Sequence, residues 1–496
     1  YSNGVSDKRL RIVSKIVDNG SVLLEAIAVE GQDEFEPRLL ISDGLGCRID
    51  EKVHLNGKAY VAVSPKCYPY SPYLFDERLD YRFPQTQEIF DKVLAEVKRF
   101  TDLEHESQVV ISAAILLSYV QERFDTLPYI YLLGDNESGK SHTLRLIAEL
   151  AYRPLFGVSI PAADLFTYLG NDDFTPTILE DEVQGIEKDT EKAKIWKAGY
   201  KKGAKVPRII NENRDIRYYN AFCLKFAAGE NLIDLKGLAE RFIVIQMVEG
   251  QPEKDHYDQE DLDRFMDIRR KLLLWRCDKL LDPKLTYDFD LPWLRGRMRE
   301  LYLPLLTVVR DTTYYQVLEE FVRRKVEERI EAKRNSLEGF LTKIVAFLIE
   351  ERETYEIPFI DIWARIKEEL DVAEPPTKPD RLETDAYGVL TKQKVGRRLR
   401  EVLGSQIKRE WSKGKAMVIH IFDPQKLEKA LRRFSLTDLT DLTDSQKAEA
   451  DEPPSKSPEK PEIEGHEEGD HALENSKIGN SVRYLKLSEV VEDAQA

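Results

Sequence analysis

The chain has 496 residues, and 42% of them are hydrophobic, so it is long enough for three or four domains with apolar cores. Its net charge is −16, but the charge is unevenly spread. Residues 435–496 hold 16 acidic and 6 basic residues, a net of −10, whereas residues 391–434 hold 13 basic and 4 acidic residues, a net of +9. The overall acidity therefore does not exclude a polyanionic partner, because a basic segment lies directly before an acidic one.

Cysteine usage and hydropathy exclude two further classes of protein. Cys47, Cys67, Cys223 and Cys277 form no CxxC pair, which disfavours a zinc site or a disulfide framework and favours free thiols in a reducing cytoplasm. No signal peptide and no apolar run long enough to cross a bilayer is visible. We therefore expect a cytoplasmic protein without a membrane partner.

The first element expected along the chain is a small β-rich N-terminal domain, residues 1–80. Short apolar runs at 10–17, 21–29, 37–42 and 59–64 are separated by Asn-Gly and Asp-Gly turn signals. Two helices with apolar stripes follow, at 88–100 and 109–120. From 129 to 247 apolar runs alternate with helical patterns, which predicts a mainly parallel sheet between helices, an α/β core spanning about 85–255.

The remainder of the chain is predicted to be helical and then disordered. Residues 256–335 are charged and mostly helical, and form a lid and linker. In 338–434, helices are expected at 338–351, 358–370 and 385–403, followed by a strand, a turn and a second strand, which together predict a winged helix. Residues 435–496 contain a Leu-Thr-Asp repeat and are rich in Pro, Glu and Lys, so we expect an acidic disordered tail.

The most informative motif is the run Gly134-Asp135-Asn136-Glu137-Ser138-Gly139-Lys140-Ser141, which lies between the apolar run 129–133 and a helical pattern that starts at His142. This strand, glycine-rich turn and helix are the context of a phosphate-binding loop. Gly134 and Gly139 let backbone N–H groups point at phosphate oxygens, and the helix N-terminus adds its positive dipole. Lys140 would reach the β- and γ-phosphates, and the Ser141 hydroxyl would bind Mg²⁺. ATP and Mg²⁺ are the expected cofactors.

A second apolar run, 177–182, ends in Glu180-Asp181-Glu182. Asp181 would hold Mg²⁺ and Glu182 would polarise the attacking water. Three successive carboxylates leave one residue of ambiguity in this assignment. The alternative is a strand that ends in solvated carboxylates.

A basic hairpin is expected next, with strands at 206–210 and 216–220, inserted before the core strand 222–229. Such a hairpin can project into the pore of a ring and bind the phosphates of a single strand, although a solvated charged hairpin remains the alternative. The basic residues of this segment are Lys201, Lys202, Lys205, Arg208, Arg214 and Arg217.

Two polar residues complete the candidate catalytic set. Asn231 follows the core strand, where a polar side chain can sense the γ-phosphate. Arg241 precedes the strand 242–247 and is the candidate arginine finger, which would stabilise transition-state charge on the nucleotide of a neighbouring subunit. An ordinary surface arginine is the alternative reading.

The predicted winged helix has its own basic residues. Its third helix could enter a major groove of duplex DNA while the wing contacts phosphates, although winged helices also bind proteins. The residues expected to contact DNA are Lys392, Lys394, Arg397, Arg398 and Arg400 on the helix and Lys413 and Lys415 on the wing.

Together these segments resemble the AAA+ ATPases that carry an inserted hairpin, which include superfamily-three and minichromosome maintenance helicases. The chain is most similar to helicase-like ATPases of phages, plasmids and other mobile elements, which often form the C-terminal half of primase–helicase proteins. The resemblance covers roughly residues 105–310 and is carried by 128–141, 177–182, 197–208, 239–245 and 297–306. Glu180 departs from the pattern, since that position is usually apolar.

The resemblance implies ATP hydrolysis, a ring that is commonly a homo-hexamer, and DNA as the track. Arg297 or Arg299 could supply a lid-sensor arginine. The resulting hypothesis is an ATP-dependent DNA helicase or translocase that acts in replication of a mobile element. A nucleotide-switched DNA-binding initiator or regulator and a protein-remodelling ATPase remain as alternatives.

Overall fold

The computed structural model describes residues 9–436, with gaps at 33, 79–80, 171–174, 184, 210–214, 236, 286–289, 371–379 and 413–414. The chain divides into one compact unit, residues 1–435, and a second that begins at Leu436. The acidic tail therefore lies almost entirely outside the described residues.

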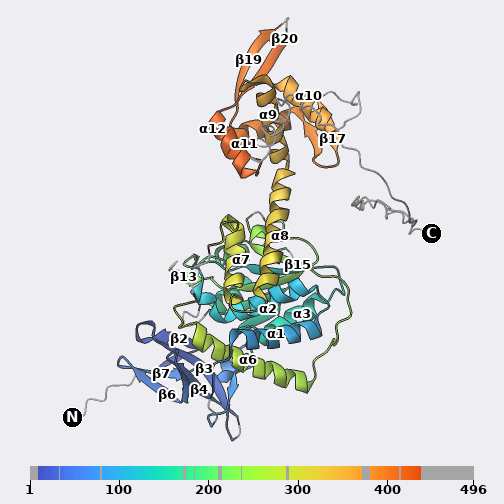
Figure 1. Ribbon diagram of the computed structural model, residues 1–496. Helices are drawn as coiled ribbons and strands as arrows, with labels where there is room; N and C mark the ends of the chain where they lie inside the picture. The colour runs from blue at the N-terminus through green and yellow to red at the C-terminus, as the bar shows by residue number, and fades with distance from the viewer. Residues whose placement is uncertain are drawn as a thin grey trace, which may run out of the picture. The chain divides into compact units, whose positions relative to one another are not determined.

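The N-terminal region is built from β-strands, as the short apolar runs between turn signals predict. Its larger sheet has the order β2-β3-β4-β5, with β8 beside β3, and its smaller sheet has the order β1-β7-β6 (Figure 1). The strands are β1 (Arg9–Ile12), β2 (Ser14–Val17), β3 (Val22–Glu30), β4 (Phe35–Ser42), β5 (Cys47–Asp50), β6 (Lys52–Leu55), β7 (Lys58–Ala62) and β8 (Leu74–Phe75).

The centre of the α/β core is a five-stranded sheet with the order β10-β11-β14-β9-β15. Every pairing in it is parallel, which agrees with the alternation of strands and helices in the sequence. Four of the strands follow the apolar runs expected at 129–133, 177–182, 222–229 and 242–247, whereas the remaining strand was expected at 156–160 and begins two residues earlier. Their bounds are β9 (Tyr129–Leu133), β10 (Pro154–Val158), β11 (Thr177–Asp181), β14 (Lys225–Gly229) and β15 (Phe242–Gln246).

Helices cover this sheet, and the buried apolar residues fall into separate clusters: helical residues between 89 and 150 belong to the largest, and those between 162 and 196 belong to others. The helix α2 is apolar on nearly all sides, and 13 of its 16 residues are buried, as expected for a helix enclosed by other elements. The helices that precede and follow the strands are α1 (Thr86–Phe100), α2 (His105–Val120), α3 (Lys140–Leu150), α4 (Ala162–Leu169) and α5 (Thr190–Ala198).

A two-stranded hairpin, β12 (Lys205–Ile209) and β13 (Ile216–Asn220), is inserted between α5 and β14. Its register pairs Arg208 with Arg217. The expectation of a hairpin in this segment is confirmed.

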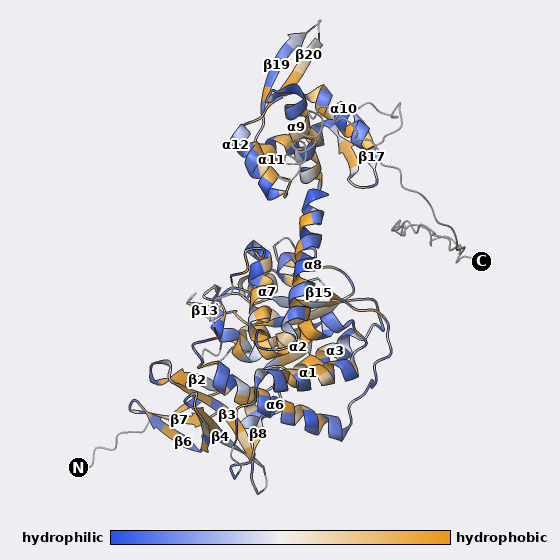
Figure 2. Cartoon of the chain, in the orientation of Figure 1, coloured by the Kyte–Doolittle hydropathy of each residue, from blue (hydrophilic) through white to orange (hydrophobic). Residues whose placement is uncertain are grey.

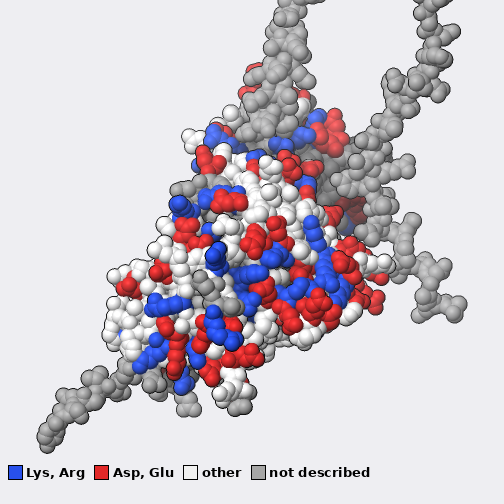
Figure 3. Space-filling view, turned by 60° about the horizontal axis from the view of Figure 1, so that its bottom comes forward, with Lys and Arg blue, Asp and Glu red and all other residues white. Residues whose placement is uncertain are grey.

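Three long helices follow the sheet: α6 (Gln259–Lys279), α7 (Gly296–Val308) and α8 (Tyr315–Arg334). Ion pairs one helical turn apart line α6, such as Lys271 with Asp267. On the face in Figure 3, basic and acidic side chains are likewise mixed, so the visible part of that face has no broad area of one sign. In α8 only Leu318, Phe321 and Val322 are buried, and hydrophilic and hydrophobic residues alternate along it (Figure 2).

The segment 337–434 combines helices with a three-stranded antiparallel sheet of order β16-β20-β19. The expected helix at 385–403 is wrong in its first part, because 381–391 form a second hairpin and the Thr391 side chain caps a shorter helix. The elements are α9 (Leu337–Arg352), β16 (Glu356–Pro358), α10 (Phe359–Glu369), β17 (Arg381–Thr384), β18 (Gly388–Thr391), α11 (Lys392–Leu403), β19 (Gln406–Ser412), β20 (Lys415–Ile421) and α12 (Pro424–Arg433).

A buried charge cluster joins the N-terminal sheet to the core and to α6. The Glu25 carboxylate on β3 accepts hydrogen bonds from Arg153 Nη2 at 2.6 Å and from Arg276 Nε at 2.8 Å, and all three side chains are fully buried or nearly so. Burial alone would raise the pKa of Glu25, but the two guanidinium groups hold it below its usual value. The cluster ties together segments that are 128 and 251 residues apart.

Among the helices of the described residues, none combines the length and apolar character needed to cross a bilayer.

Candidate functional site: a phosphate-binding pocket at one edge of the sheet

The loop after β9 has the backbone geometry that phosphate binding requires. A Cβ atom on Gly134 would lie 2.5 Å from the Met247 carbonyl oxygen, so only glycine fits between these two segments. Gly139 has φ +80° and directly precedes α3. The loop therefore turns sharply at its end and leaves the first N–H groups of α3 without intrahelical partners, which makes an anion site.

Lys140 is the first residue of α3, and its side chain folds back over the loop. Its ammonium group donates to the carbonyl oxygen of Gly134 at 2.8 Å, to that of Asp135, and to Ser138 Oγ at 3.3 Å. These acceptors hold the positive charge within the loop, where a phosphate would meet it.

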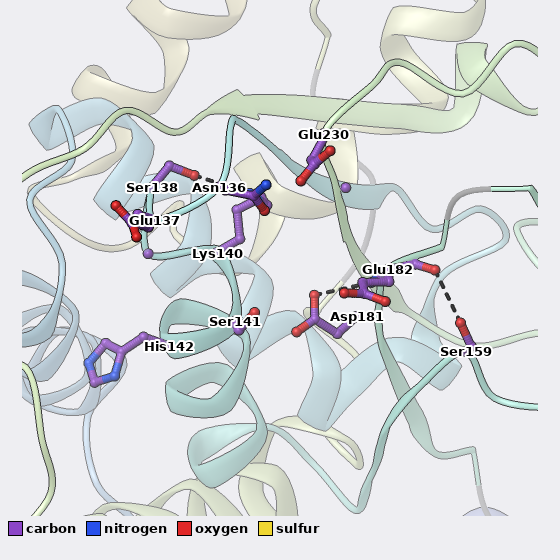
Figure 4. Close-up of a pocket in the computed structure, with 12 residues that line it drawn as sticks. Asn136, Glu137, Ser138, Lys140, Ser141, His142, Ser159, Asp181, Glu182 and Glu230 are labelled. Carbon is purple, nitrogen blue, oxygen red and sulfur yellow. Dashed lines mark hydrogen bonds between the residues drawn. The ribbon is translucent and has the colours of Figure 1, made fainter.

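Two carboxylates at the end of β11, Asp181 and Glu182, line the same pocket as this loop. Asp181 is 7% exposed, and its Oδ1 accepts from the backbone N–H of Glu182 at 3.1 Å. Glu182 is exposed and has φ +55°, a left-handed conformation that is uncommon for a residue other than glycine. Its carbonyl oxygen accepts from Ser159 Oγ at 3.4 Å (Figure 4).

Glu180 points to the other face of the strand and resolves the ambiguity among the three carboxylates. It is fully buried and forms an ion pair with Lys192 of α5. Burial raises the pKa of Glu180 to about 7 despite this partner. Because side chains alternate across a strand, Asp181 is the residue directed at the phosphate-binding loop, with Glu182 just beyond the strand end.

A pocket of about 630 Å³ brings the loop and the carboxylates together. Most predicted nucleotide-binding residues line it, whereas Gly134 and Asp135 contribute through the backbone path of the loop. The lining residues are Asn136, Glu137, Ser138, Gly139, Lys140, Ser141, His142, Ser159, Asp181, Glu182, Gly229 and Glu230. In Figure 4 the side chains of Ser141 and Asp181 lie on facing sides of this pocket, so a hydroxyl and a carboxylate oxygen, both ligands that Mg²⁺ favours, are available there.

Three lining residues were not found from the sequence. Ser159 follows β10, Gly229 is the last residue of β14 and Glu230 follows it; both strands flank β11 in the sheet. Their positions in the chain could have revealed them, because residues that directly follow parallel strands lie at the same edge of the sheet. Asn231, the predicted sensor, lies instead on a neighbouring cavity of about 420 Å³, and its carbonyl oxygen accepts from Tyr131 OH at 2.6 Å.

A second cavity, of about 210 Å³, adjoins the pocket and shares with it Glu137, Ser138, Gly139 and His142. Its other walls come from residues 100–102 and from 247–255. The His142 ring stacks on Tyr257, with 5.0 Å between the ring centroids, and burial lowers the pKa of the imidazole. Sequence reasoning missed these walls because they lie far from the loop along the chain.

Arg241 lies at the opposite edge of the sheet. It ends a 3-10 turn that leads into β15, whose first residue, Phe242, pairs with Tyr129 at the start of β9. The phosphate-binding loop follows the end of β9, so the two sites are separated by the length of a five-residue strand, roughly 16 Å. Within one protomer Arg241 is therefore not a ligand of the pocket.

The predicted basic hairpin leads into the start of β14, at the same edge of the sheet as Arg241, and packs against α4. Lys205 and Arg217 are exposed, whereas Arg208 lies over the ring of Phe166, 4.8 Å from its centroid, and Arg217 donates to the Gly170 carbonyl oxygen at 2.9 Å. Lys201 and Lys202, both exposed, are at the base of the hairpin. Arg214 lies outside the described residues.

The predicted basic residues of 391–434 are only partly brought together. Lys392, Lys394, Arg397 and Arg400 line one groove between α11 and the sheet. Arg398 points elsewhere and pairs with Glu338 and Glu401. Lys413, and the side chain of Lys415, lie outside the described residues.

No protein-family model matches the sequence, and no curated protein matches it. Among solved structures, the C-terminal region of NrS-1 is similar with a TM-score of 0.36 and 13% identity, over 75% of this chain and 83% of that one. A full-length MCM homolog from Methanopyrus kandleri has a TM-score of 0.35 and 15% identity, over 62% of this chain and 78% of that one. The active helicase Cch of SCCmec type IV has a TM-score of 0.34 and 11% identity, over 82% and 95%. At such identities the likeness concerns the arrangement of elements, and not individual residues.

Proposed function

We propose that the chain is an ATP-dependent DNA helicase or translocase that works as a ring, in the replication of a mobile element. One observation carries the proposal: Lys140, Asp181 and Glu182 line a single pocket at one edge of a parallel sheet. A phosphate-binding lysine, a metal-binding carboxylate and a water-orienting carboxylate are the groups that nucleoside triphosphate hydrolysis requires.

In this proposal the triphosphate lies along the loop, and Mg²⁺ is held by Ser141 and Asp181. Glu182 accepts a hydrogen bond from the attacking water, and Ser159 fixes the backbone that carries this carboxylate. Glu230, which also lines the pocket, takes the sensing role first expected of Asn231. The base lies in the adjoining cavity between residues 100–102 and His142.

A ring is supported by the position of Arg241. Because this residue is at the edge of the sheet remote from its own pocket, it can stabilise transition-state charge only on a neighbour's nucleotide. Its guanidinium lies over the ring of Tyr200, which directly precedes the basic segment of the hairpin. Movement of Arg241 toward the nucleotide of a neighbouring subunit would therefore shift Tyr200 and the adjoining hairpin residues that are proposed to contact DNA.

Two basic surfaces support DNA as the track. The hairpin would contact the phosphates of a single strand inside the ring. We take the segment 337–434, which holds α9, α10, α11 and an antiparallel sheet, as a winged helix whose basic groove along α11 would contact duplex phosphates.

The test is ATP hydrolysis by the purified chain with and without single-stranded DNA. We expect DNA-stimulated turnover that Lys140→Ala abolishes and that Lys194→Ala, which removes an exposed lysine of α5, preserves. Hydrolysis that is indifferent to Lys140→Ala would overturn the proposal. Particle mass measured with an ATP analogue and single-stranded DNA should show the ring.

Strand displacement separates the helicase from the two alternatives. A forked DNA substrate should be unwound in the presence of ATP. Tight binding of one duplex sequence without unwinding would favour an initiator or regulator, for which the α11 groove would suffice. ATPase activity stimulated by an unfolded polypeptide but not by DNA would favour protein remodelling, with Tyr218, exposed on the hairpin, as a pore residue.

A further inference from the structure

The basic groove of the C-terminal segment has a volume of about 700 Å³. One wall is α11, which contributes four basic side chains, and none of the described residues that line the groove is acidic. The floor is formed by Ile407, Val418 and His420 of the β19–β20 hairpin. A positively charged wall beside an apolar floor suits a polyanion that also presents flat apolar surfaces.

The floor of the groove continues along the hairpin. Side chains alternate across a strand, so Ile407, Arg409 and Trp411 of β19 share one face. The register places Val418 opposite Arg409 and the small Ala416 opposite Trp411. At about 3.4 Å per residue, Trp411 lies roughly 13 Å beyond Ile407, a distance that spans a few nucleotides.

Trp411 is 79% exposed, whereas the other tryptophans are covered. Trp196, Trp275 and Trp363 are buried, and the ring of Trp293 lies against Arg323, 4.1 Å from the guanidinium carbon. An indole this exposed contributes little to the core. Its ring faces are therefore open to a planar partner, such as an unpaired base.

We propose that this surface binds DNA at a junction between duplex and single strand, with duplex phosphates along α11 and an unpaired base stacked on Trp411. The inference rests on the proposed DNA contact of α11 and adds the form of DNA that the surface selects. Bases inside a duplex present only their edges, so a planar indole finds a base face only where a strand is unpaired. Arg409, on the same face, contacts the phosphate between the two sites.

The experiment compares binding of the full chain to a blunt DNA duplex and to the same duplex with a single-stranded thymidine tail, at one salt concentration. Base stacking of about 1–3 kcal/mol predicts that Trp411→Ala weakens binding of the tailed DNA roughly 5- to 150-fold and leaves the blunt duplex unchanged. Trp411→Phe should retain most of the affinity. Tyr355→Ala removes an exposed aromatic that does not line the groove, and should change neither.

Fluorescence gives an independent readout. The tailed DNA should protect wild-type fluorescence from an aqueous quencher, and this protection should be absent in Trp411→Phe. Equal affinity of wild type and Trp411→Ala for the tailed DNA would overturn the inference.

Substitutions on α11 distinguish failure of the Trp411 stacking role from failure of the proposed DNA contact of α11. If Lys394→Ala with Arg397→Ala weakens both DNAs but Trp411→Ala weakens neither, the α11 contact stands and the stacking role is wrong. If the α11 changes and Trp411→Ala all leave both affinities unchanged, the surface does not bind DNA, and both proposals for it fail.

Discussion

Arg241 lies over the ring of Tyr200, with 4.3 Å between the guanidinium carbon and the ring centroid. Arg297 of α7 lies over the same ring, 4.9 Å from the centroid, and its hydrogen bond to the phenol lowers the pKa of Tyr200. Since Lys201 follows Tyr200 in the chain, two arginines and the base of the hairpin meet at one aromatic ring. The position would let a contact of Arg241 with a neighbouring subunit, as proposed, reach the segment proposed to contact DNA.

The proposed action of Arg241 across a subunit boundary can be tested by mixing variants. Arg241→Ala should keep ATP binding but lose turnover by about 10³-fold or more, because transition-state charge is left uncompensated. Mixed with Lys140→Ala, it should regain activity, since roughly a quarter of the interfaces in a randomly mixed ring would pair an intact pocket with an intact arginine. Phosphate release measures both effects.

The matched control is Arg295→Ala, which removes an exposed arginine near the start of α7. It should leave hydrolysis unchanged. Two inactive variants that stay inactive after mixing, in rings shown to exchange subunits, would contradict the role across the boundary.

The ion pair of Glu180 and Lys192 should be important for stability and not for catalysis. Lys192→Met would leave a buried carboxylate without its partner, and we expect a loss of about 3–5 kcal/mol in the free energy of unfolding. Lys194→Met, on the exposed face of the same helix, should cost little. Chemical denaturation of both variants measures the difference, and an equal loss in the two would show that burial of the pair is unimportant.

Stability should also depend on pH through Glu180. Its pKa is about 7 in the folded chain, above the usual 4.5, so the folded state binds the proton more tightly than the unfolded state between these values. The contribution of this carboxyl to stability is thus complete below pH 4.5 and decreases as the pH rises to about 7. Glu180→Gln should flatten the pH dependence of the unfolding free energy in this window. An unchanged slope would contradict the assignment.

Arg208 and Arg217 face each other across the hairpin, and like charges in register repel. A polyanion relieves this repulsion, so we expect Arg208→Ala with Arg217→Ala to reduce DNA stimulation of hydrolysis and leave basal turnover intact. The slope of log affinity for single-stranded DNA against log salt should decrease in magnitude by about 2. Lys188→Ala with Lys194→Ala, which also removes two charges, is the control, and an equal decrease there would contradict a specific role for the hairpin.

Much of the sheet could be predicted from local pattern. The five core strands and the inserted hairpin each have a continuous or alternating apolar run between turn residues, and such runs need no knowledge of neighbours. The helix expected at 385–403 was wrong in its first part because periodicity alone does not mark its start. The start of the helix is set by the Thr391 cap and by the preceding hairpin, whose turn ends at Gly388.

Parts of the candidate site could not be predicted from the sequence, because they are formed by segments that are distant in the chain and meet only in the folded structure. Lys140 belongs to a motif, and the structure places it with Asp181. Ser159 and Glu230 have no motif of their own, and their place follows from strand order alone. The role of Glu180 could not be predicted, because Lys192, which accounts for its burial, is on a helix 12 residues away.

The triad of Glu25, Arg153 and Arg276 has a practical consequence for dissecting this protein. A shortened version that starts after the N-terminal sheets would remove Glu25, the carboxylate that pairs with the buried Arg153, and would leave Arg276 with Glu122. Such a fragment should misfold or aggregate even though it retains every nucleotide-binding residue. The β-rich segment supplies the carboxylate that balances a buried charge of the core, so it should be kept in any truncation series.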